Sequence, residues 1–176
     1  EIVDVLSEVT GLDLKQNEDL IDGTQNLDSF LFASSILKTF AASLSKISND
    51  LRLMSSGPQA GIGDIKLPAR QAGSSIMPGK VNPVIPEVVN QVAFSVIGND
   101  VTVAMAVEAG QLELNAFEPV IFYKMFESLK TLKAAINTLR INCIDGITVD
   151  KAKLEKEVEE NIGLVTAIAP HIGYQM

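Results

Sequence analysis

The feature that most constrains the fold is a run of apolar and small residues, spaced three or four positions apart, between Asp22 and Met54. This spacing places the side chains on one face of a long helix. Asp22 is the expected N-cap, with Gln25 three residues later as in a capping box. The expected stripe consists of Leu27, Phe30, Leu31, Ser34, Leu37, Ala41, Leu44, Ile47, Leu51 and Met54. A helix of this kind needs other helices to cover its stripe.

Three further helices are predicted after it. One begins at Pro86, a favourable first-turn residue, and runs towards Gly110. The next runs from about Pro119 to Asn142, and a shorter, charged helix covers Val149 to Asn161. The buried face of the 119–142 helix is expected to hold Phe122, Phe126, Leu129, Leu132, Ile136 and Leu139.

Alternation with a period of two is not sustained, so no important strand is expected. The predicted fold class is therefore all-α, a bundle of long helices. Four amide side chains, at Asn90, Gln91, Asn99 and Gln111, are expected to form hydrogen bonds between helices rather than contacts with a substrate.

The overall charge argues against several classes of partner. Acidic residues outnumber basic ones 22 to 14, which gives a net charge of −8. Nucleic acids and anionic membranes bind basic patches, so neither is expected as a partner. The single cysteine, Cys143, excludes an internal disulfide and fits a cytoplasmic protein. The apolar run near residues 162–170 is interrupted and too short to cross a bilayer. Because the sequence begins with Glu1 rather than Met, an internal piece of a longer chain is expected.

The segment from Ser55 to Pro83 has a different composition. It contains five of the twelve glycines and four of the seven prolines. A loop of this length within a compact domain is usually functional or disordered. Interleaved apolar residues such as Ile62, Leu67 and Val81 are untypical of a disordered linker. A functional loop is therefore predicted, and it is called the signature loop below.

The centre of the signature loop, Gly73 to Pro83, reads Gly-Ser-Ser-Ile-Met-Pro-Gly-Lys-Val-Asn-Pro. Its hydroxyls, Lys and Asn offer a base or nucleophile, a cation for a carboxylate or phosphate, and an orienting amide. It is not a P-loop, because five residues rather than four separate Gly73 from Gly79, and Val81 follows the Lys. His171 is the only histidine and has no motif around it, so neither a Ser-His-Asp triad nor a zinc site is expected.

The 73–83 motif resembles the signature of the fumarase/aspartase superfamily. The Lys-Val-Asn-Pro ending is similar to the fumarase and aspartase branch rather than to the argininosuccinate and adenylosuccinate enzymes. The flanking sequences resemble the aspartate ammonia-lyases within that branch. These are Asp22 to Asn26, Asp50 to Leu53, Pro83 to Gln91, Val96 to Asp100, Glu108 to Asn115 and Glu118-Pro119. The resemblance thus covers most of the chain.

This resemblance implies a role for each polar residue of the motif. Ser74 matches the serine that removes a proton from Cβ of the substrate. Lys80 and Asn82 match residues that bind a substrate carboxylate, and Ser75 lies beside the base and is expected to contact substrate. Glu87 matches a Glu often found near the signature Lys. The implied reaction is the reversible deamination of L-aspartate to fumarate and ammonia, with no metal or cofactor.

Each of these assignments has a structural alternative that the residues themselves leave open. Ser74 and Ser75 are also ordinary turn residues, and Asn82 before a proline is a turn former. Lys80 is also compatible with a solvated surface position. Glu87 in the first turn of a helix complements the helix dipole without any role in catalysis.

The resemblance also implies an assembly. Residues 1–176 would form part of the central helical-bundle domain of a homotetramer, in which each active site takes residues from three chains. The N-terminal domain and the small C-terminal domain of the family are expected to lie outside this sequence, so the isolated chain is expected to be inactive. Two other functions are compatible with the sequence: a class II fumarase, which releases water from malate, and a non-catalytic helical assembly module.

Overall fold

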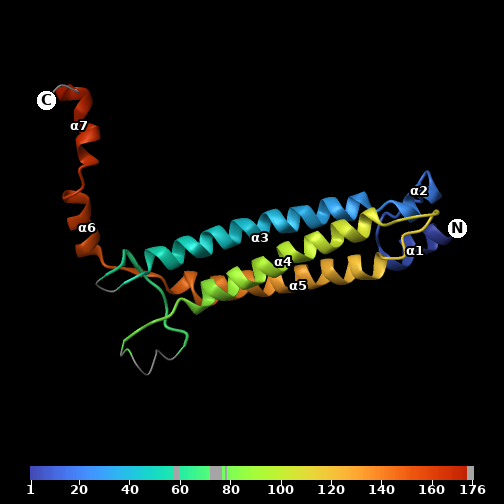
Figure 1. Cartoon of the computed structure of the whole chain (residues 1–176), viewed down its shortest axis with the longest axis horizontal. Helices are drawn as coiled ribbons and strands as arrows, with labels where there is room; N and C mark the ends of the chain where they lie inside the picture. The colour runs from blue at the N-terminus through green and yellow to red at the C-terminus, as the bar shows by residue number, and fades with distance from the viewer. Residues whose placement is uncertain (58–59, 72–76, 78, 174–176) are drawn as a thin grey trace. The chain divides into compact units, whose positions relative to one another are not determined.

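The computed structural model of the chain describes residues 1–57, 60–71, 77 and 79–173, with the backbone alone at 164, 168 and 172. Its largest elements are three long helices, α3 (Asp28–Met54), α4 (Val84–Glu108) and α5 (Glu118–Asn142). The chain forms two compact units, one of residues 1–40 and 95–130, the other of residues 41–94 and 131–176. Within each unit, the portions of the three helices lie alongside one another (Figure 1). The predicted all-α fold class with long helices is confirmed.

The first unit contains α1 (Ile2–Thr10), α2 (Leu20–Gln25) and one part of each long helix. Its core is a cluster of buried apolar side chains from α4, α5 and the residue before α3: Leu27, Val103, Ala106, Val107 and Ile121. Phe30 packs edge-on against Phe122, with 5.0 Å between ring centroids. Burial of this apolar surface holds the three helices together in the first unit.

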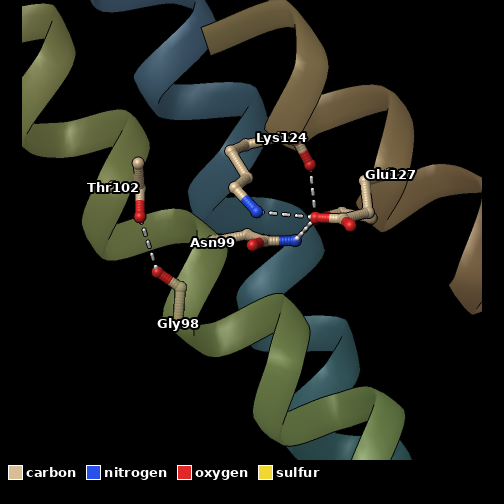
Figure 2. A network of polar contacts seen from close by, with 6 residues as sticks. Gly98, Asn99, Thr102, Lys124 and Glu127 are labelled. Carbon is tan, nitrogen blue, oxygen red and sulfur yellow. Dashed lines mark hydrogen bonds and ion pairs between the residues drawn. The ribbon is translucent and has the colours of Figure 1, made fainter. Parts of the chain in front are cut away.

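Polar side chains also join the helices of the first unit. The buried carboxylate of Asp100 on α4 accepts hydrogen bonds from Ser34 Oγ at 2.8 Å and Lys38 Nζ at 2.5 Å, both on α3. Asn99 Nδ2 donates to Glu127 Oε2 and Ser128 Oγ on α5, each at 3.1 Å. Figure 2 shows Asn99 and Lys124 pointing towards the Glu127 carboxylate. A charge inside a helix bundle is tolerated because it is paired in this way.

The predicted helix over residues 22–54 is two helices in the structure. Asp19, not Asp22, is the N-cap of α2, because its side chain accepts hydrogen bonds from the backbone of residues 21 and 22. The backbone then becomes extended at Asn26, whose side chain bonds back to Asp22, and α3 begins at Asp28. Gln25 does not complete a capping box, because its side chain accepts the Glu113 N–H at 2.8 Å. In this break between α2 and α3, the Leu27 side chain lies in the core.

The turn after α4 is held by the segment around α2. Leu112 and Glu113 both have positive φ, at 53° and 71°, which is uncommon for residues other than Gly. Buried Asn115 stabilises this turn by donating to Ala106 O at 2.9 Å and accepting from Phe117 N at 2.8 Å. Its backbone N–H donates to Thr24 O. The two stretches singled out in the sequence, 22–26 and 108–115, therefore pack against each other.

The predictions for α4 and α5 need correction in detail. α4 begins at Val84, two residues before Pro86, and ends at Glu108. On α5, Leu132 and Leu139 are buried as predicted, but Phe126, Leu129 and Ile136 are exposed, and Ile121, Ser128 and Ala135 are buried in addition. On α3, Ile47 is exposed and Ser48 is buried instead. The long helices carry apolar residues on more than one face, so spacing alone could not select the buried one.

The amide prediction was correct for two of the four residues. Asn99 bonds to α5 as described, and buried Asn90 on α4 donates to the carbonyl and hydroxyl of Ser45 on α3 at 3.1 and 2.8 Å. Gln91 and Gln111 are exposed. For the two glutamines it stays a prediction.

The second unit contains the remaining parts of the long helices, the signature loop and the chain after α5. A short antiparallel pair joins β1 (Ile65–Lys66) to β2 (Thr148–Val149), after the 3-10 turn η1 (Ile144–Gly146). Two shorter helices follow, α6 (Lys151–Glu159) and α7 (Leu164–Ile172), and the Asp150 side chain caps α6. The predicted helix over residues 149–161 is thus confirmed with tighter bounds. The strand pair was not expected, but it contains only two residues on each side.

By length and composition alone, α3 and α4 could each cross a membrane. The core helices of soluble proteins meet the same criterion. Both helices bear polar side chains that bond to a neighbouring helix, such as Ser34 with Asp100 and Ser45 with Asn90. The expectation that the apolar run at residues 162–170 is too short to cross a bilayer did not consider α3 and α4.

Candidate active site

The signature loop leaves α3 through a compact turn. Ser56 Oγ donates to Leu53 O at 2.6 Å and accepts the Ile62 N–H at 3.2 Å. The backbone N–H of Asp64 returns to Met54 O at 2.9 Å. A Cβ on Gly61 would lie 2.4 Å from the carbonyl carbon of Ser56, so only glycine fits this close approach. The sequence thus folds the first part of the loop back onto the end of α3.

The next part of the loop, residues 62–70, is fixed to the chain that follows α5. β1 pairs with β2, and Gly146 approaches Pro68 so closely that a Cβ there would lie 2.6 Å from Pro68 Cγ. Arg70 donates from Nε to Asn142 O at 3.0 Å and from Nη2 to Ile141 O at 3.4 Å. Lys153 Nζ donates to Ile62 O and forms an ion pair with Asp64 at 3.6 Å. These contacts form the first anchor of the signature loop.

The loop enters α4 through a second anchor, residues 82–87. Gly79 has φ of 80°, and the Lys80 N–H donates to Met77 O at 3.2 Å, which makes a turn just before the anchor. Val84 N donates to Asn82 O at 2.9 Å, and Glu87 N donates to Pro83 O at 3.1 Å as the helix begins. Buried Pro86 lies within this first turn. Lys80 is exposed, whereas Asn82 and Glu87 are half-buried.

Of the predicted site residues, Lys80 and Asn82 lie just before α4, and Glu87 lies in its first turn. No hydrogen bond or ion pair joins their side chains to one another in the described part of the chain. Ser74 and Ser75 lie outside the described residues. A shallow depression lined by Leu67, Pro68, Asn82, Pro83 and the residues after them also reaches Asn142 and Cys143. It brings together the two anchors and the end of α5.

Among the described residues, the other titratable groups do not form a second candidate active site. No group of three or more His, Cys, Asp or Glu side chains could hold a metal ion there. Burial raises the pKa of the Cys143 thiol, which disfavours the reactive thiolate. His171 is exposed in the last turn of α7. Hydrogen bonds from Lys124 and then Asn99 lower the pKa of Glu127, which is part of the interhelical network.

Sequence reasoning missed the residues of the first anchor, chiefly Arg70 and Lys153. Their partners lie 72 and 91 residues away in the chain, at Asn142 and Ile62 respectively. No spacing rule connects positions so far apart. The only local signal is the basic side chain of Arg70, three residues before Gly73.

Comparison with known proteins agrees with this picture. A family model described as lyase matches residues 1–98. The aspartate ammonia-lyase of Pseudomonas fluorescens is 56% identical over 170 residues, which are 97% of this chain and 36% of that protein. The aspartate ammonia-lyase of Bacillus subtilis is 47% identical over 175 residues, which are 99% of this chain and 37% of that protein.

Solved structures give the same family. A Brucella melitensis structure described as fumarate lyase:delta crystallin, bound to cobalt, matches with a TM-score of 0.93 and 51% identity over 98% of this chain and 37% of that one. The class II fumarase of Schistosoma mansoni matches with a TM-score of 0.86 and 32% identity over 98% of this chain and 38% of that one. The chain therefore spans about a third of the length of these relatives.

The residue-level resemblance and these comparisons point the same way. The family match covers more than half of the chain, and the aspartate ammonia-lyase relatives match nearly all of it. The resemblance to the fumarase/aspartase superfamily is thereby confirmed. The chain belongs to the lyase family that includes the aspartate ammonia-lyases and the class II fumarases.

Proposed function

We propose that the protein carrying this chain is an aspartate ammonia-lyase, and that the signature loop supplies part of its active site. The support comes from the named relatives: aspartate ammonia-lyases are 47–56% identical to this chain, whereas the class II fumarase structure is 32% identical. The second support is the intact motif, with Ser74, Lys80 and Asn82 all present.

In the proposed reaction, the Ser74 alkoxide takes a proton from Cβ of L-aspartate. The electron pair of the broken C–H bond moves into the adjacent carboxylate and gives an aci-carboxylate with two negative charges. The Cα–Cβ double bond then forms as the C–N bond breaks, and ammonia leaves with the bonding electron pair. The products are fumarate and ammonia, and release of the abstracted proton from the Ser74 hydroxyl to solvent restores the base, so atoms and electrons balance without a metal or cofactor.

Lys80 and Asn82 are proposed to bind a substrate carboxylate. A cation beside the carboxylate that gains charge stabilises the transition state more than the ground state, and this difference accelerates the reaction. The start of α4 adds the positive end of a helix dipole at the same place. Ser75 is proposed to contact substrate, and half-buried Glu87 to adjust the surroundings of Lys80. A serine is a weak base near neutral pH, so the site must stabilise its alkoxide.

The proposed enzyme is a cytoplasmic homotetramer built through the helices, of which residues 1–176 form part of the central domain. Large apolar side chains are exposed on all three long helices, including Phe32 (71%), Phe94 (63%), Met105 (67%) and Phe126 (66%). Exposed apolar surface of this kind is typical of a protein–protein interface. Further active-site residues would come from other parts of the protein and from other chains.

The test is fumarate formation by the full-length protein, followed by ultraviolet absorbance with L-aspartate and L-malate offered separately. Activity on aspartate and not on malate is expected. Activity on malate alone would make the protein a class II fumarase with the same signature loop. A folded tetramer that acts on neither substrate would contradict the proposal and favour a non-catalytic assembly module.

A further inference from the structure

The helix that follows the β1–β2 pair is held to the second unit by few contacts. α6 contains no buried residue, and only Lys153 and Leu154 within it are half-buried. The strand pair that precedes α6 has two residues on each side, and both residues of β2 are exposed. A strand pair this short is marginally stable unless other contacts support it. The position of α6 therefore depends on the contacts of a few side chains.

Lys153 makes the contacts that join α6 to the entry of the signature loop, residues 62–66. Its Nζ donates to the Ile62 carbonyl and lies 3.6 Å from the Asp64 carboxylate, while the carboxylate of Glu157, on α6 itself, lies 3.2 Å away. All of these residues belong to the second unit. We propose that Lys153 is an electrostatic latch, which holds α6 and β2 against the loop entry when docked and frees both when released. This inference stands independently of the proposed function.

Two features make the latch reversible. Release exposes little apolar surface, because α6 contains no buried residue. Release also leaves Lys153 with a partner, since Glu157 is four residues further along the same helix and stays within reach. Only the contacts with Ile62 and Asp64 are lost. The docked and released states should therefore differ little in free energy, so screening of one ion pair can shift the balance between them.

The ion pair of the latch is open to solvent, whereas the neighbouring contacts do not depend on an ion pair. The Lys153 and Asp64 side chains are 36% and 35% exposed, and ion pairs this exposed weaken as salt rises. The backbone N–H of Asp64 donates to Met54 O, a neutral hydrogen bond that salt does not screen. Salt should therefore release α6 and β2 while the loop entry stays attached to the end of α3.

The experiment is hydrogen exchange of the full-length protein, followed in peptides covering residues 60–71 and 147–159. Amide exchange reports the equilibrium between closed and locally opened states, so the measurement needs no catalytic activity. The variants are Lys153→Met and Asp64→Asn, with Glu157→Gln as the matched control. Glu157→Gln removes the nearer carboxylate from the same lysine, but that pair lies within α6 and exists in both states. A melting curve shows that each variant is folded.

Lys153→Met should speed exchange of the β1 and β2 amides by about 3- to 10-fold, because it removes both the ion pair and the charged hydrogen bond to Ile62 O. Asp64→Asn keeps that hydrogen bond and should speed exchange by only about 2- to 3-fold. Glu157→Gln should leave these amides at the wild-type rate. Raising salt to about 0.5 M, where the Debye length is about 4 Å, should bring the wild type to the rate of Asp64→Asn, and Asp64→Asn itself should respond little.

Three results would overturn the latch. The first is wild-type exchange of the β1 and β2 amides in folded Lys153→Met. The second is equal acceleration in Glu157→Gln and Asp64→Asn, because Lys153 would then act by stabilising α6 alone. The third is acceleration confined to residues 151–159, since the strand pair would then not depend on the lysine.

Discussion

The three long helices and the signature loop use polar residues in opposite ways. Among the helices, several polar side chains are paired across helices, as in Asp100 with Ser34 and Lys38, or Asn90 with Ser45, whereas the buried Ser48 hydroxyl has no partner among the described residues. In the loop, the described polar residues of the motif are exposed or half-buried, and the anchoring is done by backbone groups and by residues outside the motif. Paired polar groups specify how helices meet, whereas exposed or half-buried polar groups such as Lys80 and Asn82 present surface to a ligand.

This comparison predicts that substitutions in the two regions separate stability from activity. Changes among the helices should lower the free energy of unfolding and leave the activity of the folded enzyme intact. Changes in the exposed polar residues of the 73–83 motif should lower activity and leave the melting temperature intact.

The largest effect is expected for Lys80→Ala in the full-length enzyme. Loss of the proposed carboxylate-binding cation should lower kcat/KM for aspartate by about 10²- to 10³-fold, or ~3–4 kcal/mol of transition-state stabilisation. The melting temperature should stay within about 2 °C of the wild type, because Lys80 is exposed. Kinetics and calorimetry on the same sample measure both. A variant with normal kcat/KM would show that Lys80 is an ordinary surface lysine.

Among the helices, Ile121→Ala should destabilise the first unit without changing kcat. Ile121 is fully buried, so truncation should cost about 2–5 kcal/mol in the free energy of unfolding. The same truncation at Ile2, which is 79% exposed, serves as the control and should cost under about 0.5 kcal/mol. Denaturant titration gives both values. A large fall in kcat of the folded Ile121→Ala enzyme would mean that the two regions are coupled.

A smaller loss of stability is expected for Asp100→Asn. The amide keeps the shape of the side chain but loses the charge that Lys38 pairs with, at a cost of about 1–2 kcal/mol because Lys38 is partly exposed. Asp50→Asn breaks the exposed pair with Lys46 and should cost only about 0.3–0.5 kcal/mol. If the two substitutions cost the same, the buried pair contributes no more than a surface pair.

The smallest effect concerns pH. Hydrogen bonds from Lys124 and Asn99 lower the pKa of Glu127 below its ordinary value, so the folded state favours the charged carboxylate. This contribution to stability is present above the ordinary glutamate pKa and is lost as the pH falls through the lowered one. Glu127→Gln should therefore flatten the acid side of a plot of stability against pH. An unchanged acid limb would show that the network does not favour the carboxylate in solution.

The sequence was sufficient for the class of fold and for the family, whereas the site residues stay a prediction. Helical spacing located α3, α4 and α5, and the concentration of Gly and Pro located the signature loop. Lys80, Asn82 and Glu87 were proposed as site residues from the motif and its resemblance; Lys80 and Asn82 lie just before α4, and Glu87 lies in its first turn. These features are local in the chain, so local patterns could reveal them.

The features that were mispredicted depend on distant contacts. Asp22 and Gln25 have the spacing of a capping box, but Asp19 caps α2 and Gln25 bonds to Glu113, which is 88 residues away. Phe126 on α5 is apolar but exposed, because the helix presents apolar residues on more than one face. Arg70 could not be recognised as a cap for α5, because its partner carbonyls lie more than 70 positions later.

The most direct test of the central claim, that the signature loop carries the lyase chemistry, is the initial rate of fumarate formation from L-aspartate by Ser74→Ala in the full-length protein. Ser29→Ala, at an exposed serine in the first turn of α3, is the matched control. The predicted result is a loss of kcat of at least about 10²- to 10⁴-fold for Ser74→Ala, the range for removal of a general base, with no change for Ser29→Ala. A folded Ser74→Ala variant that forms fumarate at the wild-type rate would contradict the claim.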